Sequence, residues 1–150
     1  MKKIHLYSDG SSLGNPGPGG WGTVLQYKDS IKELSGAAEN TTNNQMELLG
    51  VIKGLEALKE PCDVEITSDS KYVVQGINEW LYNWIKNNWK TAAKKPVKNK
   101  ELWQDYVKIS KKHKINAKWV KGHAGHEQNE RCDFLARNEA EILKEQLNNK

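Results

Sequence analysis

The sequence has little cysteine, no long apolar run and no internal repeat. Its two cysteines, Cys62 and Cys132, cannot form a disulfide framework, so a reducing, cytoplasmic compartment is the expectation. No stretch approaches the roughly 20 apolar residues of a membrane span, and the N-terminus lacks the apolar run of a signal peptide. Without a repeat or a low-complexity linker, residues 1–150 are expected to form a single domain. The absence of a heptad pattern favours a monomer without an obligatory protein partner.

Charge is distributed unevenly along the chain. Residues 86–114 hold ten lysines and two acids, a net charge of +8; because the whole chain carries +4, the remaining residues carry −4. Trp80, Trp84 and Trp89 lead into or lie within this segment, and lysines interleaved with aromatic side chains suit a polyanion with flat bases or sugars. A solvated helix face with a few core aromatics is the alternative. The acidic remainder of the chain favours nucleic acid as the partner.

The pattern of apolar and turn-forming residues predicts a mixed α/β fold with the element order βββαβααβα. Strands are expected at residues 4–8, 21–27, 31–37, 64–68 and 115–120, and helices at 42–58, 71–88, 101–112 and 127–147. The second of these helices is expected to break or bend. The segment 10–20 is rich in glycine and proline, which predicts a loop. The sequence from Thr42 to Gln45 fits a capping box at a helix start.

Two of the predicted strands end in the same dipeptide, Ser-Asp, at Asp9 and at Asp69. If these strands are adjacent and parallel, both aspartates lie at one edge of the sheet, where α/β proteins bind ligands. Neighbouring strands lie about 4.8 Å apart, so the two carboxylates would repel each other unless a cation lies between them. An aspartate often ends a strand or caps a helix, but the repetition favours a site.

Two further acids and a histidine are candidates for the same site. Glu47 lies near the start of the first predicted helix, and Asp133 lies between two apolar residues in the last one. His123 lies between glycines in a predicted loop, where it could carry protons near neutral pH. Taken singly, each has an ordinary explanation as a helix-terminal, solvated or loop residue. An oxygen-only ligand set suits Mg2+ or Mn2+, and paired divalent ions catalyse phosphodiester cleavage.

A series of longer motifs runs through the chain. They are Tyr-Ser-Asp-Gly-Ser at 7–11, Gly-Asn-Pro-Gly-Pro-Gly-Gly-Trp at 14–21, Thr-Asn-Asn-Gln-Met-Glu-Leu at 42–48, Ser-Asp-Ser at 68–70, Trp-Lys-Thr-Ala at 89–92, Lys-Lys-Pro-Val-Lys-Asn at 94–99, Trp-Val-Lys-Gly-His-Ala-Gly-His at 119–126 and Asn-Glu-Arg-Cys-Asp at 129–133. In this order, and over nearly the whole chain, they resemble the motifs of the bacterial ribonuclease HI family, type 1 ribonucleases H.

The resemblance implies a ribonuclease H-like fold, a mixed five-stranded sheet flanked by helices, with a basic helical handle at about 80–100. It also implies hydrolysis of the RNA strand of RNA–DNA hybrids by two-metal-ion catalysis, giving 3′-hydroxyl and 5′-phosphate ends, with Mg2+ as cofactor and Mn2+ as a possible substitute. The family's metal-binding carboxylates fall on Asp9, Glu47, Asp69 and Asp133, and its catalytic histidine falls on His123. The residues similar to its substrate-binding ones are Asn15, Thr42, Asn43, Asn44, Gln45, Trp80, Trp84, Lys86 and Trp89.

Two other functions fit parts of the pattern. A DNA-cutting nuclease or strand-transfer domain shares acids at strand ends, but is not expected to share the basic handle and the loop around His123. A non-catalytic hybrid-binding module would have lost one or more of the four acids, and none is lost.

Overall fold

The computed structural model describes residues 1–122 and 126–149, and over these residues the chain forms one five-stranded sheet in the order β3-β2-β1-β4-β5. The strands are β1 (Lys2–Ser12), β2 (Gly17–Tyr27), β3 (Ser30–Thr41), β4 (Cys62–Ser68) and β5 (Lys114–Trp119). The helices are α1 (Asn43–Glu56), α2 (Lys71–Gln75), the π-helical turn η1 (Gly76–Trp80), α3 (Leu81–Lys86), α4 (Lys100–Ser110) and α5 (Glu127–Asn148). The predicted element order is confirmed, and η1 is the predicted bend.

Strand directions make the sheet mixed, as expected. β2 pairs antiparallel with both β1 and β3, whereas β4 pairs parallel with both β1 and β5. The adjacency of β1 and β4, on which the predicted meeting of Asp9 and Asp69 depends, is therefore confirmed.

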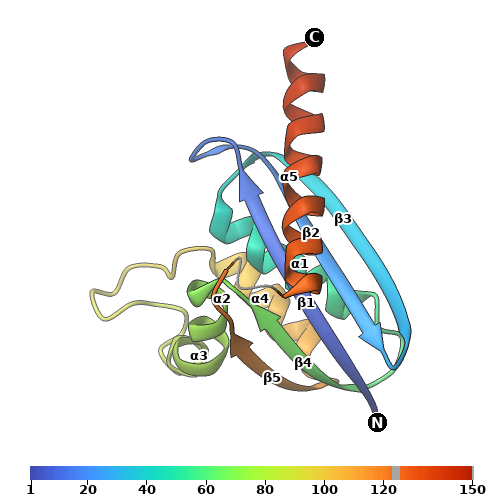
Figure 1. Cartoon of the computed structure of the whole chain (residues 1–150). Helices are drawn as coiled ribbons and strands as arrows, with labels where there is room; N and C mark the ends of the chain where they lie inside the picture. The colour runs from blue at the N-terminus through green and yellow to red at the C-terminus, as the bar shows by residue number, and fades with distance from the viewer. Residues whose placement is uncertain (123–125, 150) are drawn as a thin grey trace.

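Helices cover both faces of the sheet, with α1 and α4 on one side and α5 on the other (Figure 1). The apolar core lies between the sheet and α1 with α4, and its fully buried side chains include Leu6, Leu48, Leu55, Ile66 and Trp103. Alternate residues of a strand face opposite sides of a sheet. Since Leu6 and Ser8 of β1 lie against α1, Asp9 faces the side of α5. None of the helices in the described part of the chain is long and apolar enough to cross a membrane.

The prediction of a loop over residues 10–20 is wrong. β1 continues to Ser12 and β2 begins at Gly17, so residues 13–16 alone connect the two strands. Glycine inside a strand marks a position where another backbone approaches closely. Gly10 and Gly19 lie against α1 and Gly20 lies against α5, whereas Gly14 and Gly17 face the connection itself, so the glycines of this segment serve helix packing as well as chain reversal.

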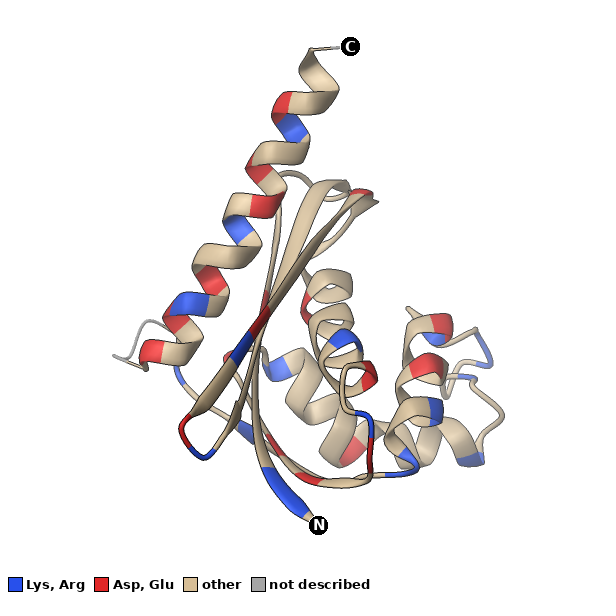
Figure 2. Ribbon diagram, turned by 90° about the vertical axis from the view of Figure 1, so that its right-hand side faces the viewer, with Lys and Arg blue, Asp and Glu red and all other residues tan. Residues whose placement is uncertain are grey.

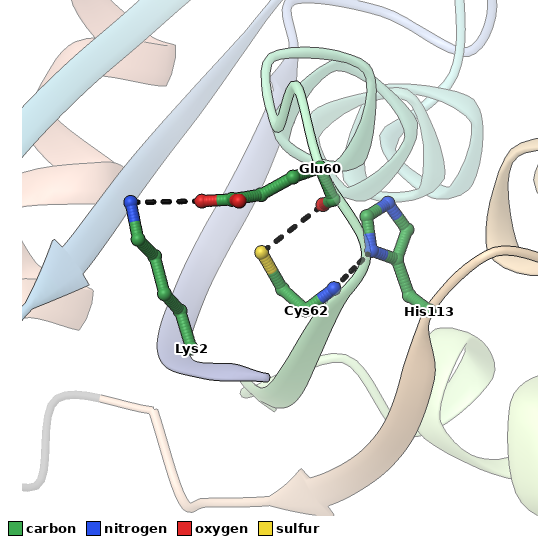
Figure 3. A network of polar contacts seen from close by, with 4 residues as sticks. All are labelled: Lys2, Glu60, Cys62 and His113. Carbon is green, nitrogen blue, oxygen red and sulfur yellow. Dashed lines mark hydrogen bonds and ion pairs between the residues drawn. The ribbon is translucent and has the colours of Figure 1, made fainter.

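A polar network links the segments at the end of the sheet where β1 and β4 begin (Figure 3). The Lys2 ammonium lies 2.8 Å from the Glu60 carboxylate, and the Cys62 backbone N–H donates to Nδ1 of His113 at 3.0 Å. The Cys62 thiol donates to the Glu60 carbonyl oxygen at 3.2 Å. Both cysteines are free thiols. This network ties the start of β1 to the segments that precede β4 and β5, at the end of the sheet opposite the carboxylates described next.

Candidate active site

Three carboxylates meet where β1 and β4 separate. The two strands pair in parallel up to Ser8 and Ser68, so Asp9 and Asp69 follow at the same level of the sheet. Glu47 joins them from α1, and one carboxylate oxygen of each of the three acids lies within 4.8 Å of the other two. The cluster therefore combines side chains from three elements that are far apart in the sequence.

A capped helix start and one glycine place Glu47 beside Asp9. The Thr42 hydroxyl accepts a hydrogen bond from the Gln45 backbone N–H, and Gln45 Oε1 accepts one from the Thr42 N–H, each at 3.2 Å. This is the predicted capping box. A Cβ atom on Gly10 would lie 2.3 Å from the backbone nitrogen of Glu47. Because Gly10 has no side chain, the first turns of α1 lie directly on β1.

A second glycine brings Asp133 in from the opposite face. Gly22 is the partner of Asp9 across the β1–β2 ladder, and a Cβ atom on it would lie 2.5 Å from the carbonyl oxygen of Cys132 in α5. α5 therefore packs directly on β2, and Asp133 lines a small pocket together with Asp9 and Asp69. Asp133 is partly exposed, lies outside the group of three acids and accepts a hydrogen bond from Arg137 at 3.0 Å, so it lies at the rim of the cluster.

Burial and mutual repulsion hold protons on this cluster. Burial, followed by the charge of Asp69, raises the pKa of Asp9 from its ordinary 3.8 to about 7, although the Gly10 N–H donates to its carboxylate at 2.9 Å and opposes the shift. Burial, followed by the charges of Asp9 and Asp69, raises the pKa of Glu47 from 4.5 to about 8. The buried Oε2 of Glu47 has no hydrogen-bond partner among the described residues. Crowded carboxylates with an unpartnered oxygen fit a divalent cation that prefers oxygen ligands.

The same pocket contains residues to which the sequence analysis assigned no role. They are Lys121, His126, Asn129 and Glu130. Asn129 lies one helical turn before Asp133, and this spacing could have identified it. Its Nδ2 donates to the Thr67 carbonyl oxygen at 3.5 Å, while its buried Oδ1 has no partner in the described part of the chain. His123, predicted to carry protons here, lies outside the described residues.

The first group of predicted substrate-binding residues lies around the start of α1. The Ser12 backbone N–H donates to Oδ1 of Asn43 at 2.7 Å, and the Ser12 hydroxyl donates to the carbonyl oxygen of Thr41 at 3.2 Å. These contacts attach the end of β1 to the start of α1 at 42–45. The exposed Asn15 lies in the connection that follows β1 directly. The structure therefore brings this group together in one surface region.

The second group lies in the handle, defined here as residues 80–100. The rings of Trp80 and Trp84 are 5.8 Å apart, and Trp84 packs at 5.5 Å on the buried Trp103. Trp89 is also partly buried and packs against the core. Much of the aromatic surface thus packs inside the protein, whereas Lys86 is exposed and lysines follow one another along the loop after α3 (Figure 2). Substrate contact by the tryptophans stays a prediction.

Comparison with known proteins places these features in one family. The RNase H family pattern matches residues 1–141. Ribonuclease H of Sulfurovum sp. (strain NBC37-1) is 60% identical over 146 residues, 97% of this chain and 96% of that protein. The crystal structure of LC9-RNase H1, a type 1 RNase H with the type 2 active-site motif, is similar with a TM-score of 0.85 at 31% identity, covering 93% of this chain and 72% of that one. LC11-RNase H1 in complex with an RNA/DNA hybrid has a TM-score of 0.71 at 25% identity, covering 93% and 98%. The chain belongs to the ribonuclease H family, whose members are metal-dependent nucleases that hydrolyse the RNA strand of RNA–DNA hybrids.

Proposed function

We propose that this chain is an endonuclease that hydrolyses the RNA strand of RNA–DNA hybrids and leaves 3′-hydroxyl and 5′-phosphate ends. The observation that carries the proposal is the convergence of Asp9, Glu47 and Asp69 within 4.8 Å in a chain of this family. The hybrid found with LC11-RNase H1 supports the substrate class.

In this proposal Asp9, Glu47, Asp69 and Asp133 hold two Mg2+ ions, for which Mn2+ is a possible substitute. Support comes from the unpartnered buried oxygen of Glu47 and from the raised pKa values that burial and repulsion give Asp9 and Glu47. When bound, such ions activate water and stabilise the leaving oxygen of a phosphodiester. Because ligands must be deprotonated, Asp9 and Glu47 release protons when the ions bind.

The surface around the start of α1 holds the two strands of the hybrid. Asn43, Gln45 and the backbone around Asn15 contact sugars of the RNA strand, whose 2′-hydroxyls distinguish RNA from DNA. Thr42, Asn44 and Asn15 hold the DNA strand. The fastening of this connection to α1 by Ser12 supports a single preformed binding surface.

The handle supplies the attraction to phosphates. Its exposed lysines, Lys86 among them, neutralise backbone charge, so binding weakens with salt. Trp80, Trp84 and Trp89 keep the handle in place and offer their exposed edges to the duplex.

His123 carries a proton during turnover. The chain acts as a single-domain monomer in the cytoplasm, a compartment that the two free thiols favour.

A cleavage assay tests the proposal. End-labelled RNA–DNA hybrid and duplex DNA are incubated with the protein, in Mg2+ or in EDTA, and the ends of the products are analysed. We expect cleavage of the RNA strand of the hybrid, in Mg2+ alone, with 5′-phosphate ends. Comparable cleavage of duplex DNA would instead support a DNA-cutting nuclease, and binding of the hybrid without cleavage would support a non-catalytic module.

A further inference from the structure

We propose that Tyr72 is a positioning residue, which fixes the substrate-binding turn at the start of α1 relative to the handle. The proposal rests on the proposed function, because it assigns to Tyr72 the alignment of two regions that a hybrid must contact together. Tyr72 itself lies in α2, outside both regions.

A chain of side-chain hydrogen bonds runs from α1 through Asn99, at the end of the handle, to Tyr72 in α2 and on to Trp103 in α4. Gln45 Nε2 donates to Oδ1 of Asn99 at 3.1 Å, and Asn99 Nδ2 donates to the Tyr72 hydroxyl oxygen at 3.1 Å. The indole Nε1 of Trp103 donates to the same hydroxyl oxygen at 2.8 Å. The Tyr72 hydroxyl thus holds α2 against the start of α4, and the Asn99 amide extends the connection to α1.

At one end of this series of hydrogen bonds, the orientation of the Gln45 amide is fixed. Its Oε1 accepts from the Thr41 hydroxyl at 3.0 Å and from the Thr42 backbone N–H at 3.2 Å. Its Nε2 must therefore point toward Asn99. The amide that completes the capping box of α1 is thus also the first link to the handle.

In the middle of the chain, Asn99 ends the lysine-rich loop of the handle. It immediately precedes α4 and has a left-handed backbone with φ 60°, a conformation that asparagine tolerates better than most residues. With both ends of its amide occupied, by Gln45 and by Tyr72, the side chain fixes the end of this loop against α1.

At the other end, the Tyr72 ring is held by its neighbours. It lies 6.0 Å from the Trp80 ring in the handle and 5.7 Å from the Trp103 ring, which is fully buried. Since the ring is wedged between core and handle, its hydroxyl is a fixed acceptor for Asn99. Removing the hydroxyl alone keeps this packing and breaks the chain of hydrogen bonds.

The substitution Tyr72→Phe makes that change. Asn99 Nδ2 and Trp103 Nε1 then lose their acceptor, so the Asn99 amide, which Gln45 contacts at its oxygen, is no longer held at its nitrogen end and fixes the end of the handle less firmly to the turn that contains Gln45. We expect the KM for the hybrid to rise about three- to tenfold, the effect of one or two hydrogen bonds. The value of kcat should stay nearly unchanged, because the carboxylate cluster makes no use of this hydroxyl.

Steady-state cleavage of a hybrid in Mg2+ by four variants tests the proposal. Tyr106→Phe is the matched control, since it removes a hydroxyl from a ring 5.9 Å from Trp103 and leaves the chain intact; its KM should equal that of the wild type. Asn99→Gly keeps the left-handed backbone and should raise KM at least as much as Tyr72→Phe does, because it removes the bonds to both Gln45 and Tyr72. In the double variant, Tyr72→Phe should add nothing further, because both changes break one chain.

The outcomes separate the two proposals. An unchanged KM in Tyr72→Phe or in Asn99→Gly, an additive effect in the double variant, or an equal loss in Tyr106→Phe would overturn the role of Tyr72, provided that the wild type cleaves the hybrid. A wild type that does not cleave hybrids would refute the proposed function itself. Thermal unfolding of each variant checks that it is folded at the temperature at which its KM is measured.

Discussion

Ser8 and Ser68 are the last residues at which β1 and β4 pair, so Asp9 and Asp69 leave the parallel ladder side by side. This register concentrates negative charge at one point of the sheet, and Glu47 adds to it. A protein without divalent ions must keep part of this cluster protonated, which has consequences for its stability.

Stability without divalent ions should fall as pH rises from about 4 to about 8. Burial and repulsion raise the pKa values of Asp9 and Glu47 from 3.8 and 4.5 to about 7 and about 8. The folded protein thus binds protons more tightly than the unfolded chain, and this contribution is complete below the unfolded values and lost as pH rises through the folded ones. Unfolding in urea with EDTA should show the fall, and Asp9→Asn should reduce its slope.

Mg2+ should reverse that loss of stability, with a larger stabilisation at pH 8 than at pH 6, because fewer protons must leave when the ion binds.

The control for the pH experiment in EDTA is Asp63→Asn, at the other end of β4, which should leave the slope of stability against pH unchanged. Equal slopes of stability against pH for the wild type and Asp9→Asn would show that burial and repulsion of these carboxylates do not destabilise the folded protein.

The variant His123→Ala should slow cleavage without abolishing it. A proton carrier contributes about 100-fold or more to the rate, whereas the metal ligands supply most of the catalysis. Single-turnover rates measure the effect, with His5→Ala on β1 as the control. A rate equal to that of the wild type would remove His123 from the mechanism.

Gly22→Ala should separate α5 from the sheet. The added Cβ atom would meet the Cys132 carbonyl oxygen at 2.5 Å, and overpacking of this kind costs about 1–3 kcal/mol. Because Asp133 moves with α5, the variant should also need more Mg2+ for half-maximal activity. Gly50→Ala is the milder control, since its nearest atom lies at 3.2 Å and alanine favours the helix. The same Mg2+ concentration for half-maximal activity in both variants would show that Asp133 does not bind the metal.

Lys86→Ala should weaken hybrid binding at low salt and reduce the slope of log affinity against log salt by about one unit, as loss of one phosphate contact does. Fluorescence anisotropy of a labelled hybrid in EDTA measures this. Lys144→Ala, near the exposed end of α5, should behave as the wild type. A salt slope that Lys86→Ala leaves intact would place the substrate away from this part of the handle.

Local signals in the sequence predicted two features that shape the carboxylate cluster. The capping box at Thr42 involves residues within one turn, and the repeated Ser-Asp at Asp9 and Asp69 follows two apolar strands. Each of these signals is contained in a few consecutive residues. The order of the elements was predictable for the same reason, since apolar periodicity is a local property, whereas the mixed five-stranded sheet came from the resemblance.

Close approach between distant elements was not predictable in this way. The glycines at 10–20 have the composition of a loop, yet Gly10 and the nearby Gly22 make room for α1 and α5. The place of Asp133 depends on that packing, so the resemblance and not the local pattern assigned it to the site. The hydrogen bonds that join Tyr72 to Asn99 connect separate elements, and no local pattern marks them.

Cleavage of an RNA–DNA hybrid in Mg2+ by the wild type, Asp69→Asn and Asp63→Asn tests most directly that the carboxylate cluster is the catalytic centre. The two substitutions make the same chemical change, one directly after β4 in the cluster and one near the start of that strand. We predict that the wild type and Asp63→Asn cleave the RNA strand at similar rates, while Asp69→Asn folds and shows no detectable cleavage. Near-normal turnover by Asp69→Asn would contradict the assignment.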